Sequence, residues 1–291
     1  MGRWMIGLSA CLLGLAPAGA QDALETGQRD FIARFQAETA PARSSARERA
    51  AAAAFLVAEL ERRGLDGERR SYRAANIHPL LDLIMPPFSG VNVTATIPAS
   101  QPGAPVIVLG GHYDSEAGSP GADDNASGVA AVLSIAGAIA AEDDRRHTVL
   151  IAFFDQEEES KIGSAALVRQ LLRAGLDIHS MHSIDMAGWD SDDDRAIEVD
   201  APDGLFARYE RAAAEMDIPL TRVRYDSSDH VSFRDAGIDA VCLGEAFRLR
   251  DSSPHRHRPT DTADTLNHAY LARNTRLMQA VLLDLVRGDA P

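Results

Sequence analysis

Residues 105–128 read PVIVLGGHYDSEAGSPGADDNASG, and this stretch decides the fold. The run from Pro105 to Gly111 is almost entirely apolar and ends in two glycines, a pattern typical of a strand buried on both faces of a mostly parallel sheet. His112 and Asp114 follow directly. We therefore expect both side chains at the carboxyl end of this strand, where α/β proteins place their chemistry.

The loop that follows, residues 115–125, contains two glycines, one proline and three acidic residues. It leads into a run of small residues, 127–141, that predicts a helix packed closely on the sheet. Asp123 and Asp124 are therefore expected at the start of that helix. Either carboxylate can act as an N-cap there, so the loop alone does not distinguish capping from metal binding.

Further strands are predicted on both sides of this stretch. Residues 91–97 alternate apolar and polar residues, and the turn residues before Pro105 suggest an antiparallel hairpin with the strand at 105–111. The other predicted strands are 70–73 at a sheet edge, 147–154, 180–187, 196–199, 222–225 and 240–244. Helices are predicted twice within 22–63, then over 203–216 and 266–286. This order predicts an α/β fold with a mixed, mostly parallel central sheet flanked by helices in a single domain.

The first twenty residues are predicted to be a cleavable signal peptide. Arg3 supplies a basic start, residues 4–15 are apolar, and residues 18–20 form a small-residue cleavage site, which leaves 21–291 as the folded domain. A membrane anchor stays open as an alternative, although the apolar run is short. A lipoprotein is a second alternative because LeuSerAlaCys at 8–11 resembles a lipid-attachment box. We expect export to the periplasm or the extracellular space, with no membrane attachment after signal cleavage.

The composition argues against several classes of partner and of catalytic mechanism. The sequence has 29 basic and 43 acidic residues, and residues 1–20 hold one of the basic residues and no acid, so the mature chain carries a charge of about −15. This charge argues against nucleic acid or an anionic membrane surface as a partner. Cys242 is the only cysteine of the mature chain and is predicted to be buried, without a disulfide. Lys161 is the only lysine, which disfavours a lysine-based mechanism.

Acids and histidines recur at the ends of later predicted strands. Strand 147–154 is followed by AspGlnGluGluGluSer. Such a run can be a solvated charge cluster, but the apolar residues on both sides argue against that interpretation here. Together these positions form a candidate set of metal ligands: His112, Asp124, Glu158, Asp185 and His257. Nitrogen and carboxylate ligands without thiolates suit Zn²⁺, or less commonly Mn²⁺ or Co²⁺. Five ligands also match the number needed by two metal ions that share one carboxylate.

The motifs around these residues resemble those of the M28 family of co-catalytic zinc metallopeptidases, whose fold also includes glutaminyl cyclases. In chain order they are HisTyrAsp (112–114), GlyAlaAspAspAsnAlaSerGly (121–128), GluGlu followed by GlySer (157–164), AspMet (185–186), SerAspHis (228–230) and HisArgProThrAspThr (257–262). Each motif alone is weak, but six in order are specific. The resemblance covers essentially the whole mature chain from about residue 90.

The resemblance implies a role for each ligand. Asp124 would bridge two zinc ions, with His112 and Asp185 completing one site and Glu158 and His257 the other. The resemblance also indicates which glutamate is the general base. Counting back from Gly163-Ser164 selects Glu157 as the general base and leaves Glu159 as a bystander.

Two further positions take their roles from the resemblance. Asp114 would orient His112 and make it a better ligand. His257 fits the family spacing better than His255. We call the segment between the predicted strand 147–154 and Gly163 the glutamate loop. The chain departs from the family at Ser160-Lys161, where Gly-Leu is common, so the edge of the glutamate loop is expected to differ.

The activity implied by the resemblance is that of an aminopeptidase, which releases N-terminal residues from a peptide with a free N-terminus, with Glu157 deprotonating the attacking water. Carboxypeptidase and dipeptidase relatives leave the cleavage position open. A glutaminyl-peptide cyclotransferase with a single zinc is an alternative, although no Trp stands beside His257. A non-catalytic, receptor-like module of the same fold is a second alternative, which the complete ligand set disfavours. The sequence gives no indication of oligomeric state or side-chain specificity.

Overall fold

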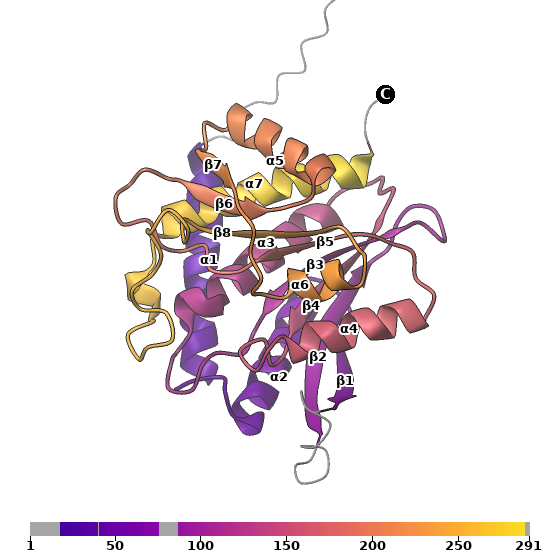
Figure 1. Cartoon of the computed structure of the whole chain (residues 1–291), viewed down its shortest axis with the longest axis horizontal. Coiled ribbons are helices and arrows are strands. Elements are labelled where there is room, and N and C mark those ends of the chain that lie inside the picture. Colours follow the sequence, from indigo (N-terminus) through magenta and orange to yellow (C-terminus); the bar gives the residue numbers. More distant parts are fainter. Residues whose placement is uncertain (1–17, 40, 76–86, 289–291) are drawn as a thin grey trace, which may run out of the picture.

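Eight strands form one sheet in the order β1-β2-β4-β3-β5-β8-β6-β7 in the computed structural model, which describes residues 18–39, 41–75 and 87–288 (Figure 1). The strands are β1 (Glu68–Ala74), β2 (Phe88–Ile97), β3 (Val106–His112), β4 (Thr148–Phe154), β5 (Ile178–Ile184), β6 (Ile197–Asp200), β7 (Leu220–Arg222) and β8 (Ala240–Glu245). The central strands β4, β3, β5 and β8 are parallel, and β1 and β2 join their neighbours antiparallel. Strand β6 pairs antiparallel with β8 and parallel with β7. The predicted α/β fold with a mixed sheet is confirmed.

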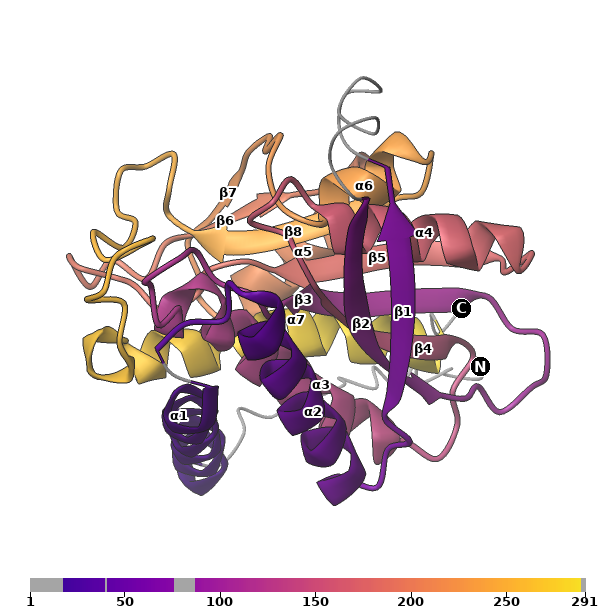
Figure 2. The ribbon, with the colours of Figure 1, turned by 90° about the horizontal axis from the view of Figure 1, so that it is seen from below.

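Helices cover both faces of this sheet. They are α1 (Ala18–Thr39), α2 (Ala46–Arg62), a π-helical turn η2 (Ala122–Ser127), α3 (Gly128–Ala140), α4 (Ile162–Arg173), α5 (Asp203–Glu215), α6 (His230–Asp235), a 3₁₀ turn η3 (Ala263–Thr265) and α7 (His268–Arg287). Helices α1, α2, α3, α5 and α7 gather on one face, and α4 and α6 on the other (Figure 2). Strand β3 is buried along its whole length because both faces are covered, as its continuous apolar run predicts.

One predicted pairing is wrong. The strands predicted at 91–97 and 105–111 do not form a hairpin, because β4 lies between β2 and β3 and pairs with both. The turn between them instead passes over the start of β4, where Ser100 N–H donates to the Arg145 carbonyl at 2.7 Å. Because β4 lies between β2 and β3, strand β3 has two parallel neighbours, β4 and β5, and is an interior strand of the sheet.

Several local features predicted by or encoded in the sequence are present in the structure. Helix α2 begins with a capping box, in which the Ser45 hydroxyl accepts from Glu48 N–H at 3.3 Å and the Glu48 carboxylate accepts from Ser45 N–H at 2.8 Å. The predicted edge strand at 70–73 is confirmed, because β1 is the outermost strand of the sheet. Cys242 is buried in β8, as expected.

The predicted signal peptide, residues 1–20, lies outside the described residues apart from 18–20, which begin α1. Its cleavage therefore stays a prediction. No helix within the described part of the chain combines the length and the hydropathy needed to cross a bilayer.

The sheet register brings the predicted site together. Parallel pairing sets His112 at the end of β3 opposite Phe154 at the end of β4, so the loops that follow both strands leave the sheet at the same level. Strand β5 ends at Ile184 on the other side of β3, immediately before Asp185. The carboxyl ends of three adjacent parallel strands thus point their loops into one region, as α/β folds do at their functional edge.

Candidate metal centre

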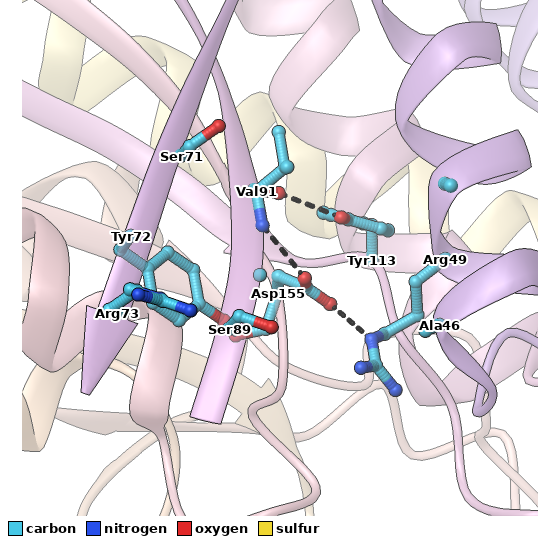
Figure 3. A pocket seen from close by; sticks show the side chains of 11 residues that line it. Ala46, Arg49, Ser71, Tyr72, Arg73, Ser89, Val91, Tyr113 and Asp155 are labelled. Carbon is cyan, nitrogen blue, oxygen red and sulfur yellow. Dashed lines mark hydrogen bonds and ion pairs between the residues drawn. The ribbon is translucent and has the colours of Figure 1, made fainter. Parts of the chain in front are cut away.

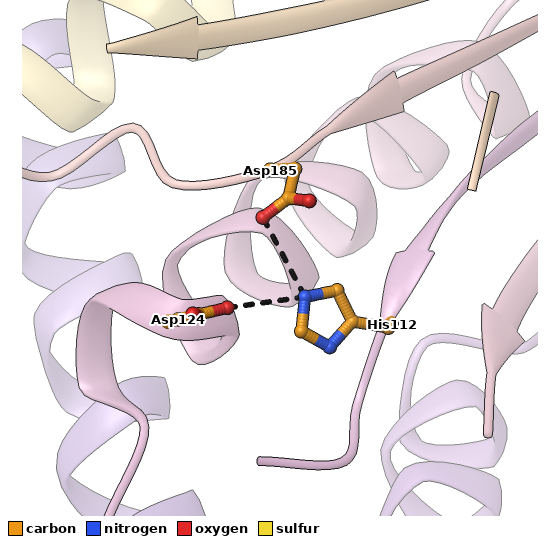
Figure 4. Close-up of side chains that lie close together, drawn as sticks. All are labelled: His112, Asp124 and Asp185. Carbon is orange, nitrogen blue, oxygen red and sulfur yellow. Dashed lines mark ion pairs between the residues drawn. The ribbon is translucent and has the colours of Figure 1, made fainter. Parts of the chain in front are cut away.

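The first donor group lies at the end of β3 (Figure 4). His112 Nε2 is 3.2 Å from Asp124 Oδ1 and 3.5 Å from Asp185 Oδ1. His112 and Asp124 are buried, and Asp185 is partly exposed. Burial lowers the pKa of the His112 imidazole, but the carboxylates of Asp114, Asp124 and Asp185 outweigh it and hold that pKa well above its ordinary value. The pocket therefore favours a positive charge between these side chains.

The second donor group meets the first at Asp124. His257 Nε2 is 3.1 Å from Asp124 Oδ2 and 2.9 Å from Glu158 Oε2. Glu116 joins Glu158 and His257 in a cluster whose donor atoms lie within 4.8 Å of one another. Asp124 thus directs one carboxylate oxygen to each group, which is the arrangement a bridging ligand needs.

His257 rather than His255 faces the donors. His255 instead contacts Thr260 Oγ1 at 2.9 Å and stacks edge-on against Trp189. His257 has a positive φ of 59°, a backbone conformation that histidine adopts more readily than most residues. The sequence preference for His257 is consistent with this geometry, and metal binding by each of the five residues stays a prediction.

The two aspartates of η2, the turn before α3, make different contacts. Asp124 points to the histidines, whereas the Asp123 carboxylate accepts from Gly188 N–H at 2.9 Å. Neither acts as the N-cap considered from the sequence, because Asn125 Oδ1 accepts from Gly128 N–H at 3.0 Å at the start of the helix. The peptide bond between Asp124 and Asn125 is cis.

Glu157 and Glu158 are placed by the loop after β4. The Asp114 carboxylate accepts from the backbone N–H groups of Glu157 at 3.1 Å and Glu158 at 3.2 Å. Burial, opposed by His112 and reinforced by Asp185, raises the pKa of Glu157 well above its ordinary value. Burial and the neighbouring Asp124 raise the pKa of Glu158 to about 8. Both carboxylates would be stabilised in their charged form by a cation.

The base of the glutamate loop is held at Asp155. The Asp155 carboxylate accepts from Val91 N–H at 3.0 Å and pairs with Arg49 Nε at 2.8 Å, beside a cavity of about 550 Å³ between α2 and strands β1 and β2 (Figure 3). Gly163 packs directly on this residue: a Cβ at Gly163 would lie 2.1 Å from the Asp155 carbonyl oxygen. This close approach explains why glycine follows the glutamates at that spacing.

Three supporting residues were not identified from the sequence. The Asp261 carboxylate accepts from the N–H groups of Asp123 at 2.8 Å and Asp124 at 3.2 Å, and so joins the His257 loop to η2. Arg256 Nε lies 3.1 Å from Asp124 Oδ2. Arg43, from the segment before α2, is buried against the loop after β3. Arginines are usually surface residues, and only the motif that includes Asp261 gave a signal in the sequence.

Sequence comparisons agree with this picture. The family model described as peptidase family M28 matches residues 92–282. A probable leucine aminopeptidase of Arthroderma otae is 28% identical over 197 residues, covering 62% of this chain and 54% of that protein. Leucine aminopeptidase 1 of Ajellomyces dermatitidis is 25% identical over 226 residues, with coverages of 70% and 58%. The chain spans little more than half the length of these relatives.

Solved structures share the fold. A zinc aminopeptidase from Bacillus subtilis, BSAP, superposes with a TM-score of 0.78 at 14% identity, over 92% of this chain and 96% of its own. The LapA aminopeptidase of Legionella pneumophila gives 0.76 at 20% identity, over 95% and 79%. A glutaminyl cyclase of Porphyromonas gingivalis gives 0.75 at 19% identity, over 90% and 98%. Because the family model covers well over half of the residues, the chain belongs to peptidase family M28.

Proposed function

We propose that the protein is a di-zinc aminopeptidase that releases N-terminal residues from peptides. The observation that carries this proposal is the position of Asp124, whose two carboxylate oxygens lie 3.2 Å from His112 Nε2 and 3.1 Å from His257 Nε2. A carboxylate shared by two groups of donors is what a pair of divalent ions requires.

The donor set fits zinc. Each group offers one imidazole nitrogen and carboxylate oxygens, without a thiolate, which is the chemistry of catalytic rather than closed structural zinc sites. The carboxylates outnumber the imidazoles, and burial makes their negative charge costly unless a cation is present. His112 and Asp185 would hold one ion, Glu158 and His257 the other, and Asp124 would contact both.

When bound, the two ions would act as Lewis acids on the substrate carbonyl and would ease deprotonation of the attacking water. Glu157 would accept that proton and pass it to the leaving amine. Asp114 would fix Glu157 relative to the donors through the backbone hydrogen bond at 3.1 Å.

A small cavity of about 80 Å³ beside Asp185 offers a place for the substrate side chain. Its lining is partly apolar, from Met186, Tyr225, Cys242 and Phe247, and partly polar, from Ser227, Ser228, Glu245 and Arg256. The acidic surroundings of the centre, with Glu157, Asp185 and Asp229 close together, would attract a free amino group. The leucine aminopeptidases among the relatives agree with this substrate class.

The test combines metal analysis with substrate hydrolysis. Metal content of the purified protein would be measured by mass spectrometry, and release of p-nitroaniline from leucine p-nitroanilide and from its N-acetyl derivative would be compared before and after chelation. Close to two zinc ions per chain, with chelator-sensitive hydrolysis of the free-amine substrate alone, supports the proposal. A single zinc with cyclisation of N-terminal glutamine would point to a glutaminyl cyclase, and absence of bound zinc would refute both.

We also propose that the protein is exported through the signal sequence at residues 1–20, to the periplasm or the extracellular space. Mass spectrometry of the protein recovered from the source cells would show a mature N-terminus at Gln21. Recovery of the full sequence starting at Met1, or of a lipid-modified Cys11, would contradict cleavage at this position.

A further inference from the structure

Arg43 is an unusual residue because its whole side chain is buried. It lies between α1 and α2, is 1% exposed, and is among the largest fully buried side chains of the described chain. The match to the family model begins at residue 92, so family membership says nothing about this position. A buried guanidinium needs several hydrogen-bond acceptors, so the identity of its acceptors indicates its structural role.

Its three donor groups all reach backbone carbonyls of one loop. Nε donates to the Tyr113 carbonyl at 2.5 Å, Nη1 to Pro120 at 2.5 Å and Nη2 to Gly121 at 2.8 Å. These acceptors stand at the two ends of residues 113–121. One end adjoins His112 and Asp114, and the other leads into η2, which carries Asp124.

The residues around the Arg43 guanidinium leave room for it and make further contacts with it. Gly121 has a φ of +62°, and a Cβ there would lie 2.5 Å from Arg43 Nη2, so glycine is what allows the guanidinium to reach this carbonyl. Phe35 of α1 stacks on the other side, with its ring centroid 4.8 Å from Arg43 Cζ. The backbone N–H of Arg43 adds a bond of 3.0 Å to Ser115 Oγ, within the same loop.

The charge of Arg43 is influenced by the acidic side chains of the candidate metal centre. Burial lowers the pKa of its guanidinium to about 10, while Asp114, Asp261, Asp124 and Glu158 act to raise it. The group therefore remains cationic at neutral pH. No carboxylate among the described residues forms an ion pair with it, so its hydrogen-bonding capacity is directed to the loop.

We propose that Arg43 is a positioning residue for the metal centre, which ties together the two ends of loop 113–121 and so fixes His112 and Asp114 relative to Asp124. The inference rests on the proposed function, because it requires these residues to bind zinc. Arg43 itself does not reach the donor atoms and acts only through the backbone of the loop. Groups that orient metal ligands typically change metal affinity by about 10-fold to 100-fold when removed.

The experiment compares Arg43→Met and Arg43→Lys with the wild type and with Arg47→Met. Arg47 is exposed and four residues away, so its substitution removes the same chemical group without touching the loop. Each metal-free protein would be titrated with Zn²⁺ alone against a chromogenic chelator, at a temperature where thermal unfolding shows it to be folded. Values of kcat and KM for leucine p-nitroanilide would be measured on the zinc-loaded proteins.

Arg43→Met is expected to bind Zn²⁺ about 10-fold to 100-fold more weakly and to lose kcat with little change in KM. Arg43→Lys, which keeps the charge but not the planar fork, should lie between Met and wild type, and it carries the test if the Met variant does not fold. Arg47→Met should match the wild type. Wild-type zinc affinity and kcat in a folded Arg43 variant would overturn the inference while leaving the proposed function standing. A wild-type protein that binds no zinc would overturn both.

Discussion

The carboxylate of Asp114 accepts a hydrogen bond from the backbone N–H of Glu157 at 3.1 Å. The same carboxylate lies 3.5 Å from His112 Nδ1 and accepts from Glu158 N–H at 3.2 Å. One side chain thus joins the loop after β3 to the loop after β4. This connection is possible because the two strands are parallel and in register, with His112 opposite Phe154. The proposed base and a proposed ligand are therefore held at fixed positions relative to His112.

Asp114→Asn is expected to weaken this connection without changing the size of the side chain. An amide offers only one acceptor oxygen, so its NH₂ group must face one of the two backbone N–H groups, and the negative charge beside His112 is lost. We expect Zn²⁺ affinity to fall by about 10-fold to 100-fold, measured by chelator competition. The same substitution at exposed Asp66 is the control. Unchanged affinity in Asp114→Asn would show that the Asp114 carboxylate does not orient His112 and would leave that role to the Asp114 backbone carbonyl, which lies 3.2 Å from His112 Nδ1.

Glu157→Gln is expected to separate catalysis from metal binding. Removal of a general base lowers kcat by about 10²-fold to 10⁴-fold, while zinc content should stay at the wild-type level because Glu157 is outside both donor groups. Glu159→Gln is the matched control, since Glu159 is exposed and accepts from Gln156 Nε2 at 2.7 Å instead of facing the centre. Near wild-type turnover in Glu157→Gln would remove the residue from the mechanism.

The sequence predicted the elements of this fold better than their pairing. Buried strands such as β3 and β4 are marked by continuous apolar runs, and the candidate site residues follow such strands, because parallel strands end at one edge of a sheet. Their individual roles came from the resemblance of the motifs to the M28 family. The hairpin predicted for 91–97 and 105–111 failed because turn residues do not show whether another strand will be inserted between their neighbours. Such insertion depends on contacts between segments 52 to 60 residues apart, from Ile97 opposite Val149 to Val93 opposite Phe153.

The residues that support the candidate centre were harder to predict. Arg43 contacts Tyr113 and Gly121 from 70 and 78 residues away, and an arginine in a polar segment gives no indication of burial. The glutamate loop has positive φ angles at Gln156, Ser160 and Lys161. Glycine is the residue that usually indicates a positive φ in a sequence, and none stands at these positions. These conformations are imposed by tertiary contacts, and only a structure reveals them.

Gly163→Ala is expected to destabilise the fold at the base of the glutamate loop. The added methyl would lie 2.1 Å from the Asp155 carbonyl and 2.6 Å from Asn92 Oδ1, so backbone must move, at a cost of about 1–3 kcal/mol or more in the free energy of unfolding. Gly137→Ala is the matched control, because it lies in the exposed part of α3 with open space around it. That change should stabilise the protein by about 0.5–1 kcal/mol. Urea unfolding would measure both, and equal effects of the two substitutions would contradict the packing at Gly163.

His182 should make the protein sensitive to acid. Its imidazole is fully buried in β5, with Tyr209 Oη at 2.9 Å and Ser180 Oγ at 3.1 Å. Burial, assisted by the nearby His179, lowers the pKa of His182 to about 3 from its ordinary value of 6.5. Between these two values the unfolded chain binds a proton that the folded chain does not. The free energy of unfolding should therefore fall as pH falls through this window, by about 1.4 kcal/mol per pH unit from this group.

His182→Gln removes the titrating group and keeps a polar side chain in its place. Because the acidic residues titrate in both proteins, their contribution cancels when the two are compared at each pH. The wild type should lose stability more steeply than His182→Gln between about pH 6 and pH 4, as measured by urea unfolding of the metal-free proteins. Parallel stability curves over this range would mean that His182 is protonated equally in the folded and unfolded chains, which is incompatible with its burial as a neutral imidazole between β5 and α5.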